Sequence, residues 1–452
     1  MRFDAILIGA GQANPPLARF LVGRGLNVAL IEENHLGGSC VNYGCTPSKT
    51  LVESAHAIHI ARRGDEYGFS ANDVQVDFTR VMRRANDAAQ ASRSSMDKRY
   101  SSLEGLTLIR AHAEFEAPKR VRAGDQVLES ERIYIDVGAR PNIPDIPGLS
   151  DIPYLTHISL LELTELPRHL IVMGGGYIGI EYAQVFRRLG SEVTVIQSGG
   201  QILSREDKDI ARAIQRALEA EGVRVLLNAK VSRFEQRSGA DVVARVNGHG
   251  EIVGSHLLSV TGVKPNTDRL GVERAGLQLD EKGYLQVDEF LETNIPGVYA
   301  LGDVNGRGAF THTSYQEYQI IAANFDKPER KVSERIPAYN VYTDPPLGRA
   351  GMSEHEVKAS GRRAFKATLK LASIQRAREA GQTEGVMKIL IDAETERILG
   401  AAFLGLHGDE VIHTIITAMA ADMPYTLLRD TMFIHPTVSE YIPTMLESLE
   451  EI

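Results

Sequence analysis

Apolar and polar positions follow a strand–turn–helix–strand order near the start of the chain. Residues 3–8 form a short apolar run, residues 9–11 form a glycine-rich turn, and a helix-like pattern extends to about residue 24. A second apolar run at 27–31 ends at Glu32. This order predicts a βαβ unit whose first turn is rich in glycine.

The same order returns later in the chain. Residues 170–173 are apolar, residues 174–179 form a glycine-rich turn, and residues 180–189 show a helical pattern before a strand at 192–196. Two such units predict an α/β protein with two Rossmann-like dinucleotide-binding domains.

The remaining segments show other patterns of apolar and polar residues. Residues 50–100 are polar and helix-rich, whereas residues 107–140 and 276–303 contain short strands and turns. From Pro337 onward strands and helices follow without another nucleotide signal, which predicts a third domain.

Composition narrows the class of protein. Net charge is −9, the pI is about 5.9 and the hydrophobic fraction is 43%. An acidic chain argues against a nucleic-acid or anionic-membrane partner, and no apolar run is long enough to span a bilayer. The N-terminus is typical of a buried strand rather than a signal peptide, so we expect a cytoplasmic protein.

The first glycine turn is suited to an anion. Gly9 and Gly11 allow a close backbone approach to a pyrophosphate at a helix N-terminus, although Asn14 replaces the third glycine of the fingerprint. Glu32 lies where a carboxylate accepts a hydrogen bond from a ribose hydroxyl. The alternative is a strand–helix turn without a ligand.

The second turn has all three glycines, Gly174, Gly176 and Gly179. Gln197 stands where a carboxylate would favour NADH, and Arg205 lies within a loop's reach. This combination favours NADPH, because a neutral amide would not repel a 2′-phosphate. The alternative for Arg205 is an ordinary surface arginine.

The only two cysteines, Cys40 and Cys45, follow the first unit. A C-x4-C pair at a helix start can form a small, reducible ring, and the helix lowers a thiol pKa. A zinc site needs four ligands, and His35 is the only near partner, so we predict no metal site. Two inert core cysteines are disfavoured by the flanking Gly-Gly and Pro-Ser-Lys.

The segment 37–49 resembles the redox-active segment of the class I pyridine nucleotide-disulfide oxidoreductases. That family includes dihydrolipoamide dehydrogenase, glutathione reductase and mercuric reductase. The resemblance covers essentially the whole chain in the family's order, with a second flavin motif at 293–303 and a terminal histidine–glutamate segment at 433–440.

The resemblance implies FAD and NADPH or NADH as cofactors. Cys45 would be the flavin-side thiol and Cys40 the thiol that exchanges with substrate. Lys49 would pair with Glu181 at the flavin, and Tyr177 would be an aromatic gate. The FAD residues would be Gly9, Gly11, Gln12, Ala13, Glu32, Gly38, Ser39, Lys49, Gly138, Gly302, Asp303, Thr311 and His312. The nicotinamide residues would be Gly174, Gly176, Tyr177, Ile178, Gly179, Gln197, Arg205 and Gly262.

His435 would be the acid–base residue, with Glu440 orienting its ring. Since the family supplies this histidine from the other chain, the resemblance implies an obligate homodimer. It also implies a discontinuous FAD-binding domain (1–150 and 258–334), an NAD(P)H-binding domain (151–257) and an α+β dimerisation domain (335–452).

The chain departs from the family pattern at Asn14, at Asp136-Val137-Gly138 in place of Ala-Thr-Gly, after Gly262, and at Gln197. The acceptor stays open between a small disulfide, a metal ion and another electron acceptor. Alternatives are a dihydrolipoamide dehydrogenase, a mercuric or metal-ion reductase, and a low-turnover redox-sensing or metal-handling flavoprotein.

Overall fold

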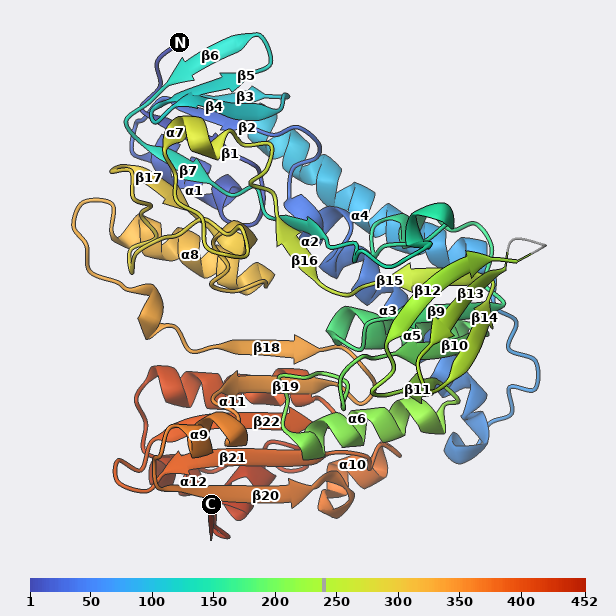
Figure 1. Ribbon diagram of the computed structural model, residues 1–452. Helices are drawn as coiled ribbons and strands as arrows, with labels where there is room; N and C mark the ends of the chain where they lie inside the picture. Colours follow the sequence, from blue (N-terminus) through green and yellow to red (C-terminus); the bar gives the residue numbers. More distant parts are fainter. Residues whose placement is uncertain (238–240) are drawn as a thin grey trace. The chain divides into compact units, whose positions relative to one another are not determined.

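The computed structural model describes residues 1–237 and 241–452, and it divides into two compact units (Figure 1). The first unit comprises residues 1–50, 80–143 and 262–335. The second comprises residues 51–79, 144–261 and 336–452. The observed α/β architecture confirms the predicted fold class.

A five-stranded parallel sheet in the order β17-β7-β1-β2-β3 is the centre of the first unit. Its strands are β1 (Ala5–Ile8), β2 (Val28–Ile31), β3 (Leu106–Ile109), β7 (Ile133–Ile135) and β17 (Val298–Ala300). All four residues of β1 are buried, because a central parallel strand is covered on both faces.

Alternate residues of β1 pack on opposite sides of this sheet. Ala5 and Leu7 share a core with helices α1 (Asn14–Gly23) and α8 (Thr311–Ala323). Ile6 and Ile8 share a core with a three-stranded antiparallel sheet. That second layer consists of β4 (Ala113–Ala117), β5 (Arg120–Ala123) and β6 (Gln126–Glu129).

Other elements complete this unit. Strands β8 (Ala139–Pro141) and β16 (Val263–Pro265) pair antiparallel, and α7 (Val272–Ala275) is a single turn. The short helix α2 (Gly38–Asn42) precedes α3 (Cys45–Arg62), whose residues after Thr50 belong to the second unit. Helix α4 (Phe78–Ser101) is the longest helix described.

The second unit begins with a four-stranded parallel sheet in the order β11-β10-β9-β15. Its strands are β9 (His169–Met173), β10 (Glu192–Ile196), β11 (Arg224–Leu226) and β15 (His256–Ser259). Helix α5 (Tyr177–Leu189) packs on β9 and β10, and α6 (Lys208–Ala220) contacts β11. An antiparallel layer covers the sheet with β12 (Val231–Gln236), β13 (Val242–Val246) and β14 (Gly250–Gly254).

A six-stranded antiparallel sheet in the order β18-β19-β22-β21-β20-β23 forms the rest of this unit (Figure 1). Its strands are β18 (Ala338–Val341), β19 (Leu347–Gly351), β20 (Ala364–Lys370), β21 (Val386–Asp392), β22 (Ile398–Leu404) and β23 (Glu450–Glu451). Its helices are α9 (Glu354–Ala359), α10 (Gln375–Glu379), α11 (Gly408–Ala420), α12 (Tyr425–Arg429) and α13 (Tyr441–Leu446).

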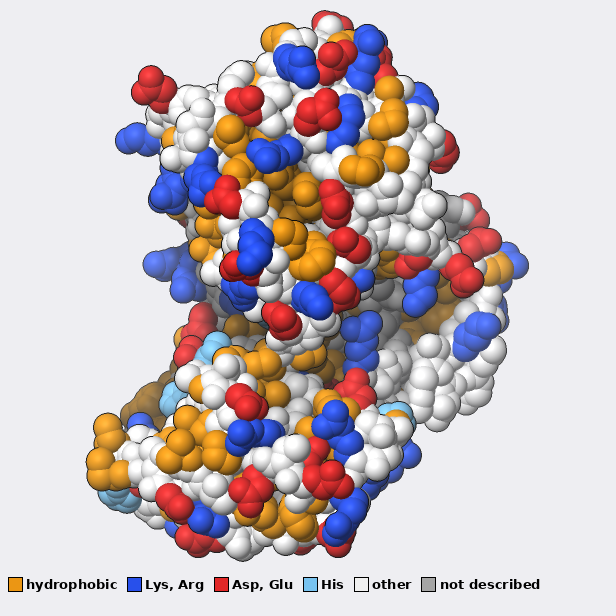
Figure 2. Space-filling model, turned by 90° about the vertical axis from the view of Figure 1, so that its left-hand side faces the viewer, with side chains coloured by type: hydrophobic (Ala, Val, Ile, Leu, Met, Phe, Trp, Pro, Cys, Tyr) orange, Lys and Arg blue, Asp and Glu red, His pale blue; other side chains and the backbone are white. Residues whose placement is uncertain are grey.

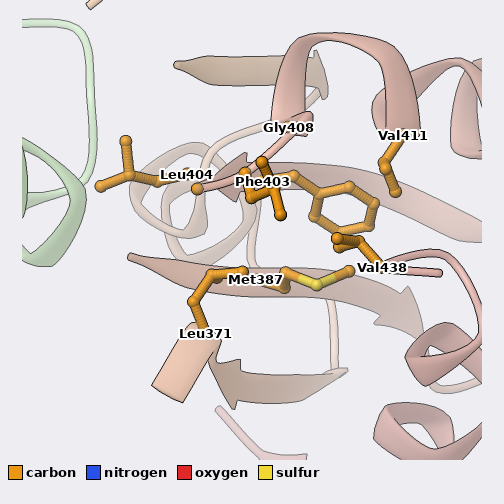
Figure 3. Close-up of a pocket in the computed structure, with 9 residues that line it drawn as sticks. Leu371, Met387, Phe403, Leu404, Gly408, Val411 and Val438 are labelled. Carbon is orange, nitrogen blue, oxygen red and sulfur yellow. The ribbon is translucent and has the colours of Figure 1, made fainter. Parts of the chain in front are cut away.

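The C-terminal segment packs on this sheet through Val438. Its side chain is 4% exposed and lines a small apolar pocket with Met387 of β21 and Phe403 of β22. Figure 3 shows these three side chains pointing toward one another. The packing of Val438 therefore anchors the segment that carries His435 and Glu440 on this sheet.

Among the described residues, no helix combines the length and the hydropathy needed to cross a membrane.

Candidate functional site

The first glycine turn brings the chain into close contact with itself at the start of α1. Gly9 has φ +83°, and a Cβ there would lie 2.3 Å from the carbonyl oxygen of Asp136. A Cβ at Gly38 would lie 2.9 Å from the Cα of Gly11. Side chains are excluded at these positions, so backbone N–H groups line the helix N-terminus, as a diphosphate requires.

Glu32 directly follows β2, and two backbone hydrogen bonds orient its carboxylate. Its Oε2 accepts from the Ala10 N–H at 2.8 Å, and its Oε1 accepts from the Asn34 N–H at 2.8 Å. Burial raises the pKa of this carboxyl, opposed by those two hydrogen bonds. The carboxylate beside the turn fits the ribose of a dinucleotide.

Asp303 lies in the 3-10 turn η4 (Gly302–Asn305), directly after β17. Burial and the nearby Glu317 carboxylate raise the pKa of Asp303 to about 6. Glu317 of α8 is fully buried and accepts from the Gly302 N–H at 2.6 Å and from the Asn305 side-chain amide at 3.0 Å. Glu317 thereby holds the turn that presents Asp303. Arg335 forms an ion pair with Glu317, with 3.1 Å between Nη1 and Oε1.

The two cysteines lie on successive helices. Cys40 is in α2, and Cys45 is the first residue of α3. Gly37 and Gly38 have φ of +94° and +58°, which lets the chain turn sharply into α2. Both cysteines are free thiols, and Cys45 Sγ lies 3.2 Å from the Thr311 hydroxyl at the start of α8.

The two thiols differ in acidity. The hydrogen bond from Cys40, together with Thr311 and the Lys49 ammonium, lowers the pKa of Cys45 to about 6 against the effect of burial. The same hydrogen bond and burial raise the pKa of Cys40. In the reduced pair, the thiolate is therefore favoured at Cys45 and the protonated thiol at Cys40.

The second glycine turn is equally close-packed. Gly174 has φ +122°, and a Cβ there would lie 2.4 Å from the Val260 carbonyl oxygen. A Cβ at Gly179 would lie 2.0 Å from the Gly174 carbonyl oxygen, whereas Gly176 has open space. Helix α5 begins at Tyr177, three residues before the predicted start, because the turn itself enters the helix.

Gln197 follows β10 and accepts from the Gly175 N–H at 3.1 Å through Oε1. Its neutral amide thus lies beside the glycine turn, and Arg205 is an exposed residue of the following loop. The residue beside the second glycine turn is therefore a neutral amide rather than a carboxylate, and the Arg205 guanidinium follows eight residues later.

His435 and Glu440 form a pair in the second unit. Nδ1 of His435 lies 2.9 Å from Oε2 of Glu440, and the histidine side chain is 73% exposed. Thr437 supports the carboxylate, donating its N–H to Glu440 Oε1 and accepting the Glu440 N–H. Glu440 thus fixes the imidazole through Nδ1 and leaves Nε2 for another partner.

The predicted residues separate by unit. The first unit contains Gly9, Gly11, Gln12, Ala13, Glu32, Gly38, Ser39, Cys40, Cys45, Lys49, Gly138, Gly262, Gly302, Asp303, Thr311 and His312. The second contains Gly174, Gly176, Tyr177, Ile178, Gly179, Glu181, Gln197, Arg205, His435 and Glu440. Lys49 and Glu181 belong to different units, so their pairing stays a prediction.

Several of these residues have structural partners. Gln12 donates its side-chain amide to the Gly37 carbonyl at 2.6 Å, which joins the glycine turn to α2. Glu181 is buried and accepts from the Tyr342 N–H at 2.8 Å. The exposed His312 ring stacks on Phe310 at 5.4 Å.

Sequence reasoning did not assign two buried acids a place in the site, Asp136 and Glu317. Asp136 accepts from the N–H groups of Ala13 and Asn14, and Glu317 holds the Gly302–Asp303 turn. An aspartate ending an apolar strand at Ile135 was a visible signal, but its partners lie more than a hundred residues away.

Comparison with known proteins gives one consistent result. Residues 3–317 match the family described as pyridine nucleotide-disulphide oxidoreductase, and residues 337–446 match its dimerisation domain. The chain is 35% identical over 449 residues to the probable pyridine nucleotide-disulfide oxidoreductase RclA of Escherichia coli, covering 97% of each chain.

Two further relatives share less identity. Mercuric reductase of Bacillus cereus is 32% identical, with 97% of this chain and 70% of the relative covered. Dihydrolipoyl dehydrogenase of Chlamydia muridarum is 29% identical, with 97% and 95% covered. Among solved structures, the Cu(II) complex of the HOCl-induced flavoprotein disulfide reductase RclA from Escherichia coli aligns with a TM-score of 0.91, 34% identity and 99% of both chains covered.

Proposed function

Since the chain belongs to the pyridine nucleotide-disulfide oxidoreductase family and is an FAD-dependent enzyme of that class, we propose that Cys40 and Cys45 are its redox disulfide. The observation that carries this proposal is the position of Cys45, which begins α3 with its Sγ 3.2 Å from the Thr311 hydroxyl while Cys40 lies in α2 just before it. The directions of the two pKa shifts agree with this geometry. A stable thiolate at Cys45 and a protonated thiol at Cys40 suit two different tasks.

In the proposed reaction, the reduced nicotinamide gives up two electrons and the Cys40–Cys45 disulfide accepts them. Bound FAD supplies the two-electron relay between them. The S–S bond breaks, one sulfur takes up a proton, and the other stays a thiolate. Thr311 and Lys49 stabilise the thiolate at Cys45, so Cys40 is the sulfur that exchanges with an acceptor.

His435 is the proposed acid–base residue. For Cys40 to attack an acceptor disulfide it must lose its proton, and its raised pKa makes a neighbouring base necessary. Glu440 holds the His435 ring by Nδ1, which leaves Nε2 to take that proton and later give it to the leaving thiolate.

Three exposed apolar side chains support a homodimer in which this histidine acts in trans. Leu427, Met432 and Ile434 are 54%, 89% and 77% exposed, and they precede His435 by one to eight positions. Figure 2 shows exposed hydrophobic side chains on the part that carries the six-stranded sheet, as well as elsewhere on this face. A second copy would cover this surface, in keeping with the matched dimerisation domain.

NADPH is the proposed nicotinamide. Gln197 places a neutral amide beside the second glycine turn, and Arg205 offers a guanidinium to a 2′-phosphate. Arg205→Ala should lower kcat/KM for NADPH about tenfold or more and leave NADH nearly unchanged, because only NADPH carries the phosphate. Equal losses with both nucleotides would contradict this preference.

The proposed acceptor is a small disulfide or a metal ion, with a cytoplasmic location as predicted from the sequence. Relatives named mercuric reductase and a structure titled as a Cu(II) complex make Hg(II) and Cu(II) the metal ions to test. Among the described residues, no cluster of three or more His, Cys, Asp or Glu side chains could hold a resident metal.

Anaerobic titration of the purified protein with NADPH and NADH tests the function, followed by a panel of disulfides, Cu(II) and Hg(II). We expect a long-wavelength absorbance band on reduction that disappears in Cys45→Ser and persists in Cys40→Ser. Acceptor turnover should disappear in both variants. Turnover that survives Cys40→Ser would remove the exchange role. Reduction without turnover of any acceptor would favour the redox sensor instead.

A further inference from the structure

Asp136 lies at the helix N-terminus that is proposed to hold the flavin diphosphate. It directly follows β7, and its side chain reaches the N-terminus of α1, where Oδ2 accepts from the N–H groups of Ala13 and Asn14 at 3.0 and 2.9 Å. Those N–H groups are the ones that a helix start offers to an anion. A protein carboxylate therefore already uses part of the anion site.

The other carboxyl oxygen faces two glycines. A Cβ at Gly11 would lie 2.6 Å from Asp136 Oδ1, and a Cβ at Gly302 would lie 2.9 Å from it. Both glycines belong to turns that approach the proposed flavin site, one at α1 and one at Asp303. Asp136 Oδ1 thus lies against the backbones of both glycine turns, in the space where a side chain at either position would have to stand.

The first turn of α1 carries a second unusual polar group. Asn14 is fully buried, and its Nδ2 donates to the carbonyl oxygens of Ile8, Gly9 and Tyr134. Its Oδ1 has no hydrogen-bond partner among the residues that the structure describes. The first turn of α1 thus buries a side-chain acceptor that has no donor, in the same turn whose N–H groups bind Asp136.

The charges around Asp136 disfavour its ionised form. Burial raises its pKa well above the usual range, and the carboxylates of Asp303 and Glu317 raise it further, whereas the two N–H groups oppose this. Arg335 faces Glu317 rather than Asp136. No Lys or Arg of residues 1–237 or 241–452 forms an ion pair with Asp136.

We propose that Asp136 binds the flavin diphosphate as a neutral carboxylic acid, so that FAD binding takes up one proton. An ionised Asp136 would repel the diphosphate, whereas the acid donates its O–H to a phosphate oxygen and releases α1 N–H groups for the ligand. The inference rests on the proposed flavin site at α1 and concerns this chain's departure from the family's Ala-Thr-Gly.

Because FAD binding takes up a proton on Asp136, the affinity for FAD depends on pH with a definite sign. The negative diphosphate raises the pKa of Asp136 in the complex above its value in the free protein. Below the free-protein value the affinity is constant, and above it each pH unit weakens FAD binding by up to about tenfold, until the pKa of the complex is reached.

The test measures FAD release from the holoenzyme. The protein is diluted into buffers from pH 5 to 10, and the fluorescence of released FAD gives a dissociation constant at each pH. We expect wild type to bind FAD progressively more weakly as the pH rises. Asp136→Asn and Asp136→Ala should lose this dependence and bind FAD more tightly than wild type at the highest pH.

Two controls make the result specific. Asp326→Asn removes an exposed carboxylate that pairs with Arg24 at the far end of α1, and it should keep the wild-type pH dependence. Asp303→Asn removes one of the two carboxylates that raise the pKa of Asp136. A slope that persists in both Asp136 variants, or that disappears only in Asp303→Asn, would overturn the inference, as would pH-independent binding by wild type. A wild-type protein that carries no FAD would instead refute the flavin site itself.

Discussion

At the scale of single residues, Thr311 stabilises the thiolate form of Cys45. Its hydroxyl lies 3.2 Å from Cys45 Sγ and helps to lower the pKa of that thiol to about 6. We predict that Thr311→Val raises this pKa by somewhat less than about one unit, since a lost hydrogen bond costs about 1 kcal/mol. Thr311→Ser keeps the hydroxyl and should titrate like wild type. Ultraviolet thiolate absorbance of the reduced protein measures the midpoint, and an unchanged midpoint in Thr311→Val would remove Thr311 from the site.

His56 gives a pH dependence of stability within the second unit. Its Nδ1 lies 3.0 Å from Asp344 Oδ2, and this hydrogen bond raises the pKa of His56, opposed by burial. Because the raised pKa belongs to the folded state, the stabilisation is complete below the unfolded value of about 6.5 and is lost as the pH rises through the folded value.

We predict that the unfolding midpoint in urea falls between pH 6 and 8.5 in wild type and falls less in His56→Gln. The difference should stay below about 1 kcal/mol, because the His56 side chain is partly exposed and solvent screens the pair. His59, whose pKa is lowered mainly by burial, is present in both proteins and cancels in the comparison. Parallel pH profiles for the two proteins would show that the pair contributes nothing to stability.

At the scale of elements, hydrophobic periodicity predicted the strands and helices that local sequence determines. The strand predicted at 27–31 is β2 (Val28–Ile31), and the helix predicted to about residue 24 is α1 (Asn14–Gly23). The role of Asp136 was out of reach, because its partner Asn14 is 122 positions away and only the folded sheet brings them together. Asn14 likewise appeared as a defect in a glycine motif, whereas its amide joins the carbonyls of two strands.

The C-terminal segment offers a test at the same scale. Val438 packs between Met387 and Phe403, and this contact holds the stretch that positions His435 (Figure 3). We predict that Val438→Ala destabilises the protein by about 1–2 kcal/mol and lowers turnover, since the buried methyl groups leave a cavity. Ile143→Ala, at a side chain that is 37% exposed and outside the proposed dimer surface, should change the stability little. Full activity in Val438→Ala would mean that the segment is positioned by other contacts.

At the scale of the whole molecule, the decisive question is whether two chains build one active site. Cys40 and His435 lie in different compact units, and the homodimer proposal assigns the histidine to the opposite subunit. Cys40→Ser and His435→Ala should each be nearly inactive as homodimers. In a mixed dimer, however, the intact Cys40 of one chain meets the intact His435 of the other. Co-expression with two different tags, followed by purification through both tags, yields that mixed dimer. We expect it to recover about half of the wild-type turnover, because one of its two sites is complete.

A mixed dimer of Cys40→Ser and Cys45→Ser has no complete site and should stay inactive. If the first mixed dimer is as inactive as its parents, His435 does not act across the interface, and the site belongs to a single chain.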